Sequence, residues 1–437
     1  MMEQQDLEQD ILRLKNGSKF FFLTIRILFI IFVLKLFLIS NLLSKEIKII
    51  ADKNNIEELL KLDPNNIDFL FIYAKKKEEL NEYELAEKIY KRIISLRPNE
   101  LRFYLDLARV QFLRFDYINS EKNFLFIYKK KNIPKNVKYN IRNYLKMINR
   151  NKSGKVNYTV KLSRSDNINN GTYADSVKLF GVPFKIDENA KAKSSYELFT
   201  NINGSIDQSI LGQKINAGFD ISNSDFKSKI YDRLKYGVNI GPEFIVKNQK
   251  INLDYSFSQE KIGFSKVLNS NQLMLKSFHN KKNSQFEYIV GIDNKSYYNN
   301  SNYNSDGNFV ELRSNFFFKD RFSLGANYRY TKNDALKDFY GNEKNYFELT
   351  SSANLLKNFS FNLSTGIEIS AYDKFQPIFS KTRKDYLRFI NLTIRNDKFF
   401  IGNYMPQLSL TYRENNSNVS VYETKSDNVS FYLVKEF

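Results

Sequence analysis

The last two thirds of the chain alternate between apolar and polar side chains with a period of two. In residues 359–370, Phe and Ile or Leu side chains alternate with Ser, Asn, Gly and Glu, and the same pattern fills residues 215–221, 251–258, 322–330 and 407–413. Successive side chains of a β-strand point to opposite faces, so each segment predicts a strand with one apolar face. Many segments run for ten residues or more. Soluble strands average about 5–6 residues, whereas strands that cross a bilayer need about 9–11.

These segments predict a transmembrane β-barrel over residues 155–437. We count about fourteen, an even number as in single-chain bacterial barrels. They begin near Val156, Ala192, Asp207, Lys227, Lys250, Gln272, Gln285, Asn308, Arg321, Asn345, Asn358, Lys384, Met405 and Asn428. Twelve or sixteen strands stay possible because residues 383–395 alternate poorly. The alternative, a soluble β-sandwich, would have to pack two sheets without any Trp at a hydrophobic fraction of 42%.

The polar face of each strand is expected to line a water-filled lumen. Candidate lumen residues are Asp220, Asp254, Asp293, Arg329 and Glu368, although charges in a lumen also serve solubility and internal pairing. The final strand carries Phe431, Leu433 and the terminal Phe437 on one face. A C-terminal aromatic strand is the type of signal that barrel assembly machinery recognises.

Residues 45–152 show helical spacing and an internal repeat. Asp63-Pro64-Asn65 and Arg97-Pro98-Asn99 are 34 residues apart, the tetratricopeptide period. At the same offset, small residues recur at Ala74 and Ala108, and aromatic residues at Tyr90 and Phe124. Residues 134–148 predict a helix that caps the array.

Helical arrays of this kind bind proteins on a concave face. The aromatic and basic residues expected on or near that face are Tyr73, Tyr104, Arg97 and Arg102. The alternative is that the tyrosines pack between repeats.

Residues 1–44 contain an apolar stretch from Phe20 to Leu43, preceded by Lys15 and Lys19. This pattern favours a signal peptide. A single anchoring helix is the alternative, at the cost of placing Arg26 and Lys35 in the bilayer. Either interpretation places the rest of the chain outside the cytoplasm.

Composition argues against most enzymes. The chain has no Cys and one His, His279, so thiolate or histidine metal sites and Ser–His triads are not expected. A barrel enzyme would have to depend on His279, which we expect near a turn. No cofactor is predicted. The net charge of +19 is spread over the chain without a basic stripe interleaved with stacking aromatics, so nucleic acid is not expected as a partner.

The order of export segment, short helical repeat and barrel resembles the surface lipoprotein assembly modulator (Slam) family. The resemblance is carried by residues 107–124 (LARVQFLRFDYINSEKNF), residues 133–148 (IPKNVKYNIRNYLKMI), the terminal Phe437 and the motif Ser165, Asp166, Asn167, Ile168, Asn169 and Asn170. It implies an outer-membrane translocon with a periplasmic tetratricopeptide domain and a fourteen-stranded barrel. It further implies transport of lipoproteins, or related secreted haem-binding proteins, to the cell surface. Periplasmic chaperones, barrel assembly machinery and outer-membrane lipid are the other partners expected.

Two other functions fit the same architecture. An exopolysaccharide exporter also joins tetratricopeptide repeats to a barrel, usually with a longer array and more strands. A passive diffusion porin would leave the protein-binding repeats without a role.

Overall fold

The computed structural model describes residues 55–130, 133–151, 154–210, 213–246, 249–281, 283–318, 322–356, 358–396, 398–402 and 404–436. The predicted export segment, residues 1–44, and Phe437 lie outside these ranges. The chain divides into two compact units, residues 1–69 and 70–437. All contacts between elements described below lie within the second unit.

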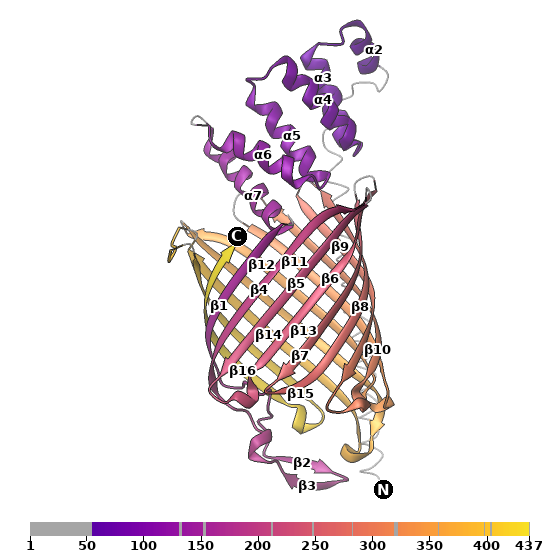
Figure 1. Ribbon diagram of the computed structural model, residues 1–437, viewed down its shortest axis with the longest axis vertical. Helices are drawn as coiled ribbons and strands as arrows, with labels where there is room; N and C mark the ends of the chain where they lie inside the picture. The colour runs from indigo at the N-terminus through magenta and orange to yellow at the C-terminus, as the bar shows by residue number, and fades with distance from the viewer. Residues whose placement is uncertain are drawn as a thin grey trace, which may run out of the picture. The chain divides into compact units, whose positions relative to one another are not determined.

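Within residues 55–151, the structure describes six helices that precede the barrel and follow the predicted repeat (Figure 1). They are α2 (Asn55–Leu62), α3 (Ile67–Glu79), α4 (Tyr83–Leu96), α5 (Leu101–Leu113), α6 (Tyr117–Tyr128) and α7 (Lys135–Asn151). The turns after α3 and α5 both use a left-handed residue, Asn81 and Phe115, which are themselves 34 residues apart.

Small residues at the repeat positions allow the helices to approach closely. Ala74, Ala86, Ala108 and Ser120 have no exposed surface, and the Ser120 hydroxyl donates to the Ala108 carbonyl at 2.7 Å. Tyr90 and Phe124 fill the layer between helices and are also buried. The helical repeat predicted from the 34-residue period is therefore confirmed, with α7 as the helix that follows it.

Fourteen strands close into an antiparallel barrel, as the alternation predicts. They are β1 (Lys155–Ser165), β4 (Ser195–Ile210), β5 (Gln213–Phe226), β6 (Arg233–Val246), β7 (Gln249–Ile262), β8 (Ser265–Lys281), β9 (Ser284–Tyr297), β10 (Ser305–Phe318), β11 (Phe322–Ala335), β12 (Asn342–Leu356), β13 (Phe359–Gln376), β14 (Lys381–Asn396), β15 (Met405–Ser417) and β16 (Thr424–Glu436). The barrel closes where β1 pairs with β16, from Asn157 opposite Glu436 to Ser165 opposite Asn428. A separate hairpin, β2 (Ser176–Leu179) and β3 (Val182–Lys185), lies in the long loop between β1 and β4.

Three predicted strand starts were wrong. We placed starts near Asp207, Lys227 and Gln272, whereas β4 continues to Ile210 and the corresponding strands begin at Gln213, Arg233 and Ser265. The polar residues around Asp207 resemble a turn, but the period of two continues through them: Ile206 and Ile210 are both exposed apolar residues of one face.

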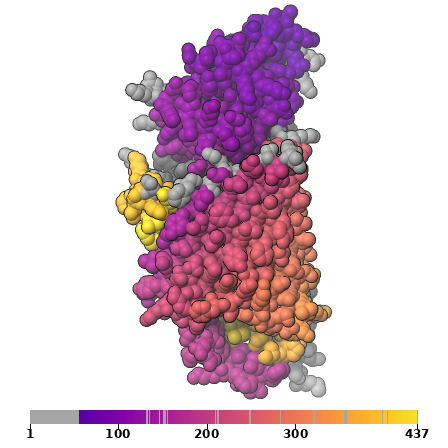
Figure 2. Space-filling model, in the orientation of Figure 1, coloured from indigo at the N-terminus to yellow at the C-terminus, as the bar shows by residue number. Residues whose placement is uncertain are grey.

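The two faces of the barrel wall differ in polarity. Apolar side chains at alternate positions, such as Leu253, Tyr255, Leu275 and Val290, are exposed on the outer face. Polar side chains of the other face, such as Asp254 and Asp293, are buried inside. This arrangement suits a wall with lipid outside and water inside. Figure 2 shows the outer face of the strands as a continuous surface.

We name the two ends of the barrel by where β1 begins and where it finishes. At the array end β1 begins after α7, and the strands that follow one another there are separated by two to eight residues in the sequence. At the loop end β1 finishes, and most hairpins carry a short 3₁₀ turn, as at residues 229–231, 301–303, 338–340, 377–379 and 420–422.

Candidate functional site

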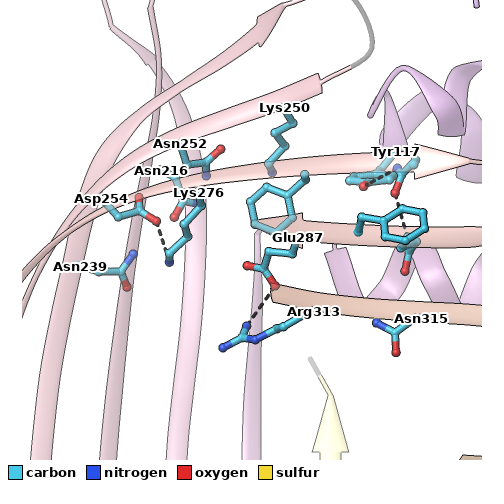
Figure 3. A pocket seen from close by; sticks show the side chains of 14 residues that line it. Tyr117, Asn216, Asn239, Lys250, Asn252, Asp254, Lys276, Glu287, Arg313 and Asn315 are labelled. Carbon is cyan, nitrogen blue, oxygen red and sulfur yellow. Dashed lines mark hydrogen bonds and ion pairs between the residues drawn. The ribbon is translucent and has the colours of Figure 1, made fainter. Parts of the chain in front are cut away.

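A polar cavity of about 310 Å³ lies against the inner wall of strands β5 to β10. Lys250, Asn252 and Asp254 line it because alternate residues of β7 point inward. Lys276 of β8 and Arg313 of β10 contribute in the same way, and Figure 3 shows these side chains pointing into one space. The site is therefore built by strand periodicity, without a specialised loop.

Acidic and basic side chains in this cavity pair across neighbouring strands (Figure 3). Lys276 Nζ lies 2.8 Å from Asp254 Oδ2, and Arg313 Nη1 lies 3.0 Å from Glu287 Oε2. The side chain of Glu243 is only 1% exposed and lies 2.7 Å from the ammonium groups of both Lys214 and Lys250. Two cations offset the cost of burying that carboxylate.

A second cavity of about 340 Å³ lies against strands β9 to β13. Arg329 Nη1 is 3.5 Å from Glu311 Oε2, and Lys344 Nζ is 3.4 Å from Glu368 Oε1. Glu311 also accepts from Arg313 Nε at 2.7 Å, and Arg313 lines the first cavity. The two cavities are thus joined by one chain of alternating charges.

The predicted lumen residues all lie on the inner face but in different places. Asp254 lines the first cavity, and Arg329 and Glu368 together line the second. Asp293 lies 2.8 Å from Lys295, which also lines the second cavity. Asp220 is more open; it lies between the exposed outer residues Phe219 and Ile221 and accepts from Asn201 at 3.0 Å.

Sequence reasoning missed the residues that complete these pairs. Glu243, Lys250, Lys276, Glu311 and Arg313 stand at inward positions of the same alternating segments. The period of two would have identified them if every charged residue at an inward position had been named as a candidate lumen residue.

One contact joins the helical array to the inner wall of the barrel. Asn280 of β8 is buried, and its Nδ2 lies 3.4 Å from the Phe112 carbonyl and 3.3 Å from the Tyr117 hydroxyl. Tyr117 also lines the first cavity, and burial raises its pKa above the ordinary tyrosine value. The start of α6 therefore lies at the array-end mouth of the barrel, which sequence reasoning did not predict.

The four predicted client-binding residues do not form one cluster. The Tyr104 ring packs 5.0 Å from that of Phe126, between α5 and α6. The Tyr73 ring lies under Lys77 of its own helix, at 5.2 Å, and the Arg102 guanidinium lies 4.9 Å from the Phe71 ring. Arg97 is exposed at the end of α4. Their role in binding stays a prediction.

An ion-pair network fixes α3 to α5. Lys75 Nζ is 2.6 Å from Asp106, and Arg109 bridges Asp106, at 3.1 Å, and Glu78. The Tyr90 hydroxyl of α4 donates to Glu78 as well, and burial raises its pKa, with the charge of Glu78 adding to the effect. These charges hold the repeats in register.

The six-residue motif at 165–170 ties the end of β1 to three neighbouring segments. Asn167 accepts from the Gly171 amide at 2.8 Å and donates to the carbonyls of Gly171 and Lys425, at 2.8 and 2.9 Å. Asp166 accepts from the Asp427 amide at 2.8 Å. Asn169 holds the backbone of residues 191 and 193 through both ends of its amide, and Ser165 accepts from the Asn167 amide.

The rest of the motif completes this junction. The carbonyl of the buried Ile168 accepts from Arg233 at the start of β6, at 2.8 Å. Asn170 adopts a left-handed conformation with φ 51°. Together the six residues bring β1, β16 and β6 to one point.

This junction belongs to a complete ring of hydrogen bonds at the loop end. Each loop or strand end bonds to the next one round the barrel. The seven donor–acceptor pairs are Gly263–Asp232, Tyr298–Val267, Leu336–Asn304, Asp373–Gly341, Asn418–Lys384, Thr172–Ser420 and Arg233–Ile168. Within this ring, Ile168 of the motif supplies the link to β6, while Thr172–Ser420 crosses the β1–β16 seam beside the bonds of Asn167 to Lys425 and of Asp427 to Asp166.

His279 lies in β8, opposite Gln249 of β7 and Phe286 of β9. The strand ends two residues later, at Lys281, so His279 lies near a strand end, as expected for a residue next to a turn. Within the described residues, no group of three His, Cys, Asp or Glu residues has a spacing suited to a metal ion. None of the described helices combines the length and apolarity needed to cross a membrane.

Comparison with known families decides the relationship. Residues 154–437 match the family model described as surface lipoprotein assembly modifier, over the whole barrel. The chain belongs to this family. Comparison with curated proteins finds no match.

Solved structures give only distant likenesses to this member of the assembly modifier family. A loop L8 deletion mutant of OmpT, an outer membrane protein of Vibrio cholerae, is 7% identical, with a TM-score of 0.38; the match covers 64% of this chain and 98% of that one. An anion-selective porin from Comamonas acidovorans is 9% identical at a TM-score of 0.36, covering 65% and 98%. A bacterial polysaccharide outer membrane secretin is 8% identical at 0.35, covering 64% and 98%. Values this low carry no argument about function.

Family membership, with the apolar outer face of a closed barrel, places this assembly modifier in an outer membrane. It indicates a translocon rather than an enzyme.

Proposed function

We propose that this chain moves lipoproteins, or related secreted haem- or metal-binding proteins, from the periplasm to the cell surface. The observation that carries the proposal is the match of the whole barrel to surface lipoprotein assembly modifiers. The helical array lies in the periplasm in this proposal and captures the client there. Periplasmic chaperones deliver the client, and barrel assembly machinery inserts the barrel by its last strand, where Phe431 is exposed on the outer face.

The contact between Asn280 and Tyr117 supports a direct route from the array into the lumen. Tyr117 belongs both to α6 and to the lining of the first cavity. A client bound by the array is therefore released beside the mouth of the barrel. The array residues that we propose for client binding are Tyr73, Tyr104, Arg97 and Arg102.

The paired charges of the inner wall suit passage of a polypeptide. Acidic and basic groups alternate along β7 to β13, so a client segment of either sign finds an exchangeable partner. The described linings of both cavities carry residues of both signs, and conduction requires binding that is weak and spread over several sites. We propose Asp220, Asp254, Asp293, Arg329 and Glu368 as part of this path.

Reconstitution tests this proposal. The purified full chain is placed in liposomes, and a lipoprotein encoded beside its gene is supplied on the array side. We expect the lipoprotein to become sensitive to protease on the loop side only in liposomes that hold the chain. Protection in both preparations, with periplasmic chaperones present, would contradict the proposed function.

A further inference from the structure

Positive charge is concentrated where the array joins the barrel. Between Lys122 and Lys155 the sequence has eleven Lys and Arg residues and no Asp or Glu. Residues 55–121 of the same array have eleven Lys and Arg against thirteen Asp and Glu, a net charge of −2. A general excess of lysine in the protein does not explain this separation, because the two segments are adjacent in the sequence.

The basic segment lies next to the membrane boundary. It covers the end of α6, all of α7 and the first residue of β1. Lys146, Arg150 and Lys152 precede β1 by three to nine residues, and Val156, exposed on the outer face, already belongs to that strand. Figure 1 shows α7 descending to the start of β1. The described part of α7 therefore ends only a few residues before the apolar outer face of β1 begins, where a headgroup layer on the array side would lie.

Four of the cations that the structure describes in this segment face solvent. Lys122, Lys129, Lys130 and Arg142 are exposed. Among the described residues no carboxylate lies within ion-pair distance of these four, whereas cations elsewhere in the array, such as Lys75 and Arg109, are paired. Lys130 and Arg142 instead lie over aromatic rings, 4.6 Å from Phe126 and 5.8 Å from Tyr139. Leu125 and Phe126 add exposed apolar surface beside them.

We infer that the segment from Lys122 to Lys155, centred on α7, binds the anionic phospholipid headgroups of the membrane leaflet on the array side. A cluster of four to eight cations beside a membrane span is enough for such binding. Each Lys or Arg near an anionic membrane surface contributes about 1 kcal/mol to the binding free energy. Exposed Leu and Phe side chains beside Lys fit an interfacial surface. Bound in this way, α7 would hold the array against the mouth of the barrel. The inference needs the membrane location but not the transport of a client.

The experiment uses the full chain in vesicles. Because the chain has no Cys, Asn140→Cys on the exposed side of α7 accepts a single polarity-sensitive fluorophore. We expect its emission to shift to the blue in vesicles that contain phosphatidylglycerol, relative to pure phosphatidylcholine. Roughly 0.5 M salt, which shortens the Debye length to about 4 Å, should reverse the shift.

Two charge variants of the labelled chain make the test specific. The first variant combines Lys138→Gln, Arg142→Gln and Lys146→Gln. It should lower the ratio of membrane-bound to free α7 about 100-fold, because each cation contributes about 1 kcal/mol to binding. The matched control, Lys61→Gln, Lys76→Gln and Lys88→Gln, removes three cations outside the segment and should keep the shift. Equal emission in both vesicle types, or equal loss in both variants, would overturn the inference. A larger response to polyglutamate than to anionic vesicles would also overturn it, in favour of an acidic protein partner. Client transport is not measured, so the outcome does not depend on the proposed function.

Discussion

Asn280 and Tyr117, which lie 163 residues apart in the sequence, meet where the helical array enters the barrel, with 3.3 Å between the amide nitrogen and the hydroxyl oxygen. Both side chains are buried, so the hydrogen bond gives the Asn280 amide and the Tyr117 hydroxyl a partner where water does not reach them. The same amide also reaches the Phe112 carbonyl at the end of α5. One side chain of the barrel wall thus holds the end of one helix and the beginning of the next.

Replacing Asn280 should loosen the array without unfolding the barrel. Asn280→Ala leaves the Phe112 carbonyl and the Tyr117 hydroxyl without this partner, a loss of about 1–3 kcal/mol. We expect faster amide hydrogen exchange in residues 112–128 of the full chain. Asn239→Ala is the control, since Asn239 of β6 lines the same cavity but forms no hydrogen bond with the helices that the structure describes. Unchanged exchange in Asn280→Ala would show that the contact does not hold the array.

The ring of loop contacts should depend on Asn167. Asn167→Ala removes three hydrogen bonds at the seam, and we expect the free energy of unfolding of the barrel to fall by about 2–3 kcal/mol. Urea unfolding in detergent micelles, followed by the loss of strand signal, measures this change. Asn170→Gly keeps the left-handed backbone next to it and should change stability little. If both variants lose a similar free energy of unfolding, the loss comes from the conformational entropy of the loop and not from the ring of hydrogen bonds.

Lumen charge should control ion selectivity. Glu311→Gln removes one negative charge between Arg313 and Arg329. The permeability ratio of anion to cation should rise by up to about fivefold, taking roughly 1 kcal/mol for a unit charge a few Å away in water. The zero-current potential across a planar bilayer with a salt gradient gives this ratio. Glu343→Gln, which changes a carboxylate on the opposite face of the wall, should leave it unchanged. A chain that passes no ion current would contradict a wet lumen.

The stability of the array should fall in acid through Glu87. Burial disfavours the ionised form of Glu87, but hydrogen bonds from Lys91, Gln111 and Arg114 outweigh burial and lower its pKa. A carboxyl whose pKa is lower in the folded state stabilises that state above its unfolded pKa of about 4.3, and the contribution disappears as the pH falls through the folded pKa.

Glu87→Gln should therefore destabilise the array at pH 7 and flatten its pH dependence below about pH 4. Thermal loss of the helical circular dichroism signal of the full chain, recorded between pH 3 and 7, follows this effect. Glu84→Gln changes an exposed carboxylate of the same helix and should keep most of the acid dependence. An unchanged slope in Glu87→Gln would place the acid-sensitive group elsewhere.

The fold could be predicted because both of its parts repeat. A period of two continued over fourteen strands leaves few alternatives, and the 34-residue offset placed Ala74 and Ala108 at the helix contacts. The inward position of Asp254 or Glu368 follows from the same period. The contacts that close the structure do not repeat. Asn280 with Tyr117 and Asn167 with Lys425 join residues far apart in the sequence, and no local pattern indicates which partners meet.

The strand ends were predictable only in part. Asp207 and its polar neighbours suggested a turn, although they form the inward face of one long strand. The client-binding residues proposed for the array depended on residue type alone, and Tyr104 instead packs against Phe126. Residue type does not separate a binding aromatic from one that packs between helices.

Surface exposure of a client in intact cells tests the central claim most directly. Cells that express a neighbouring lipoprotein, with and without this chain, are treated with external protease and the surviving lipoprotein is quantified. We predict digestion only when the chain is present, and reduced digestion when Asn280→Ala replaces the native residue. A lipoprotein that stays protected in both cells, while the barrel is correctly inserted in the outer membrane, would contradict the account.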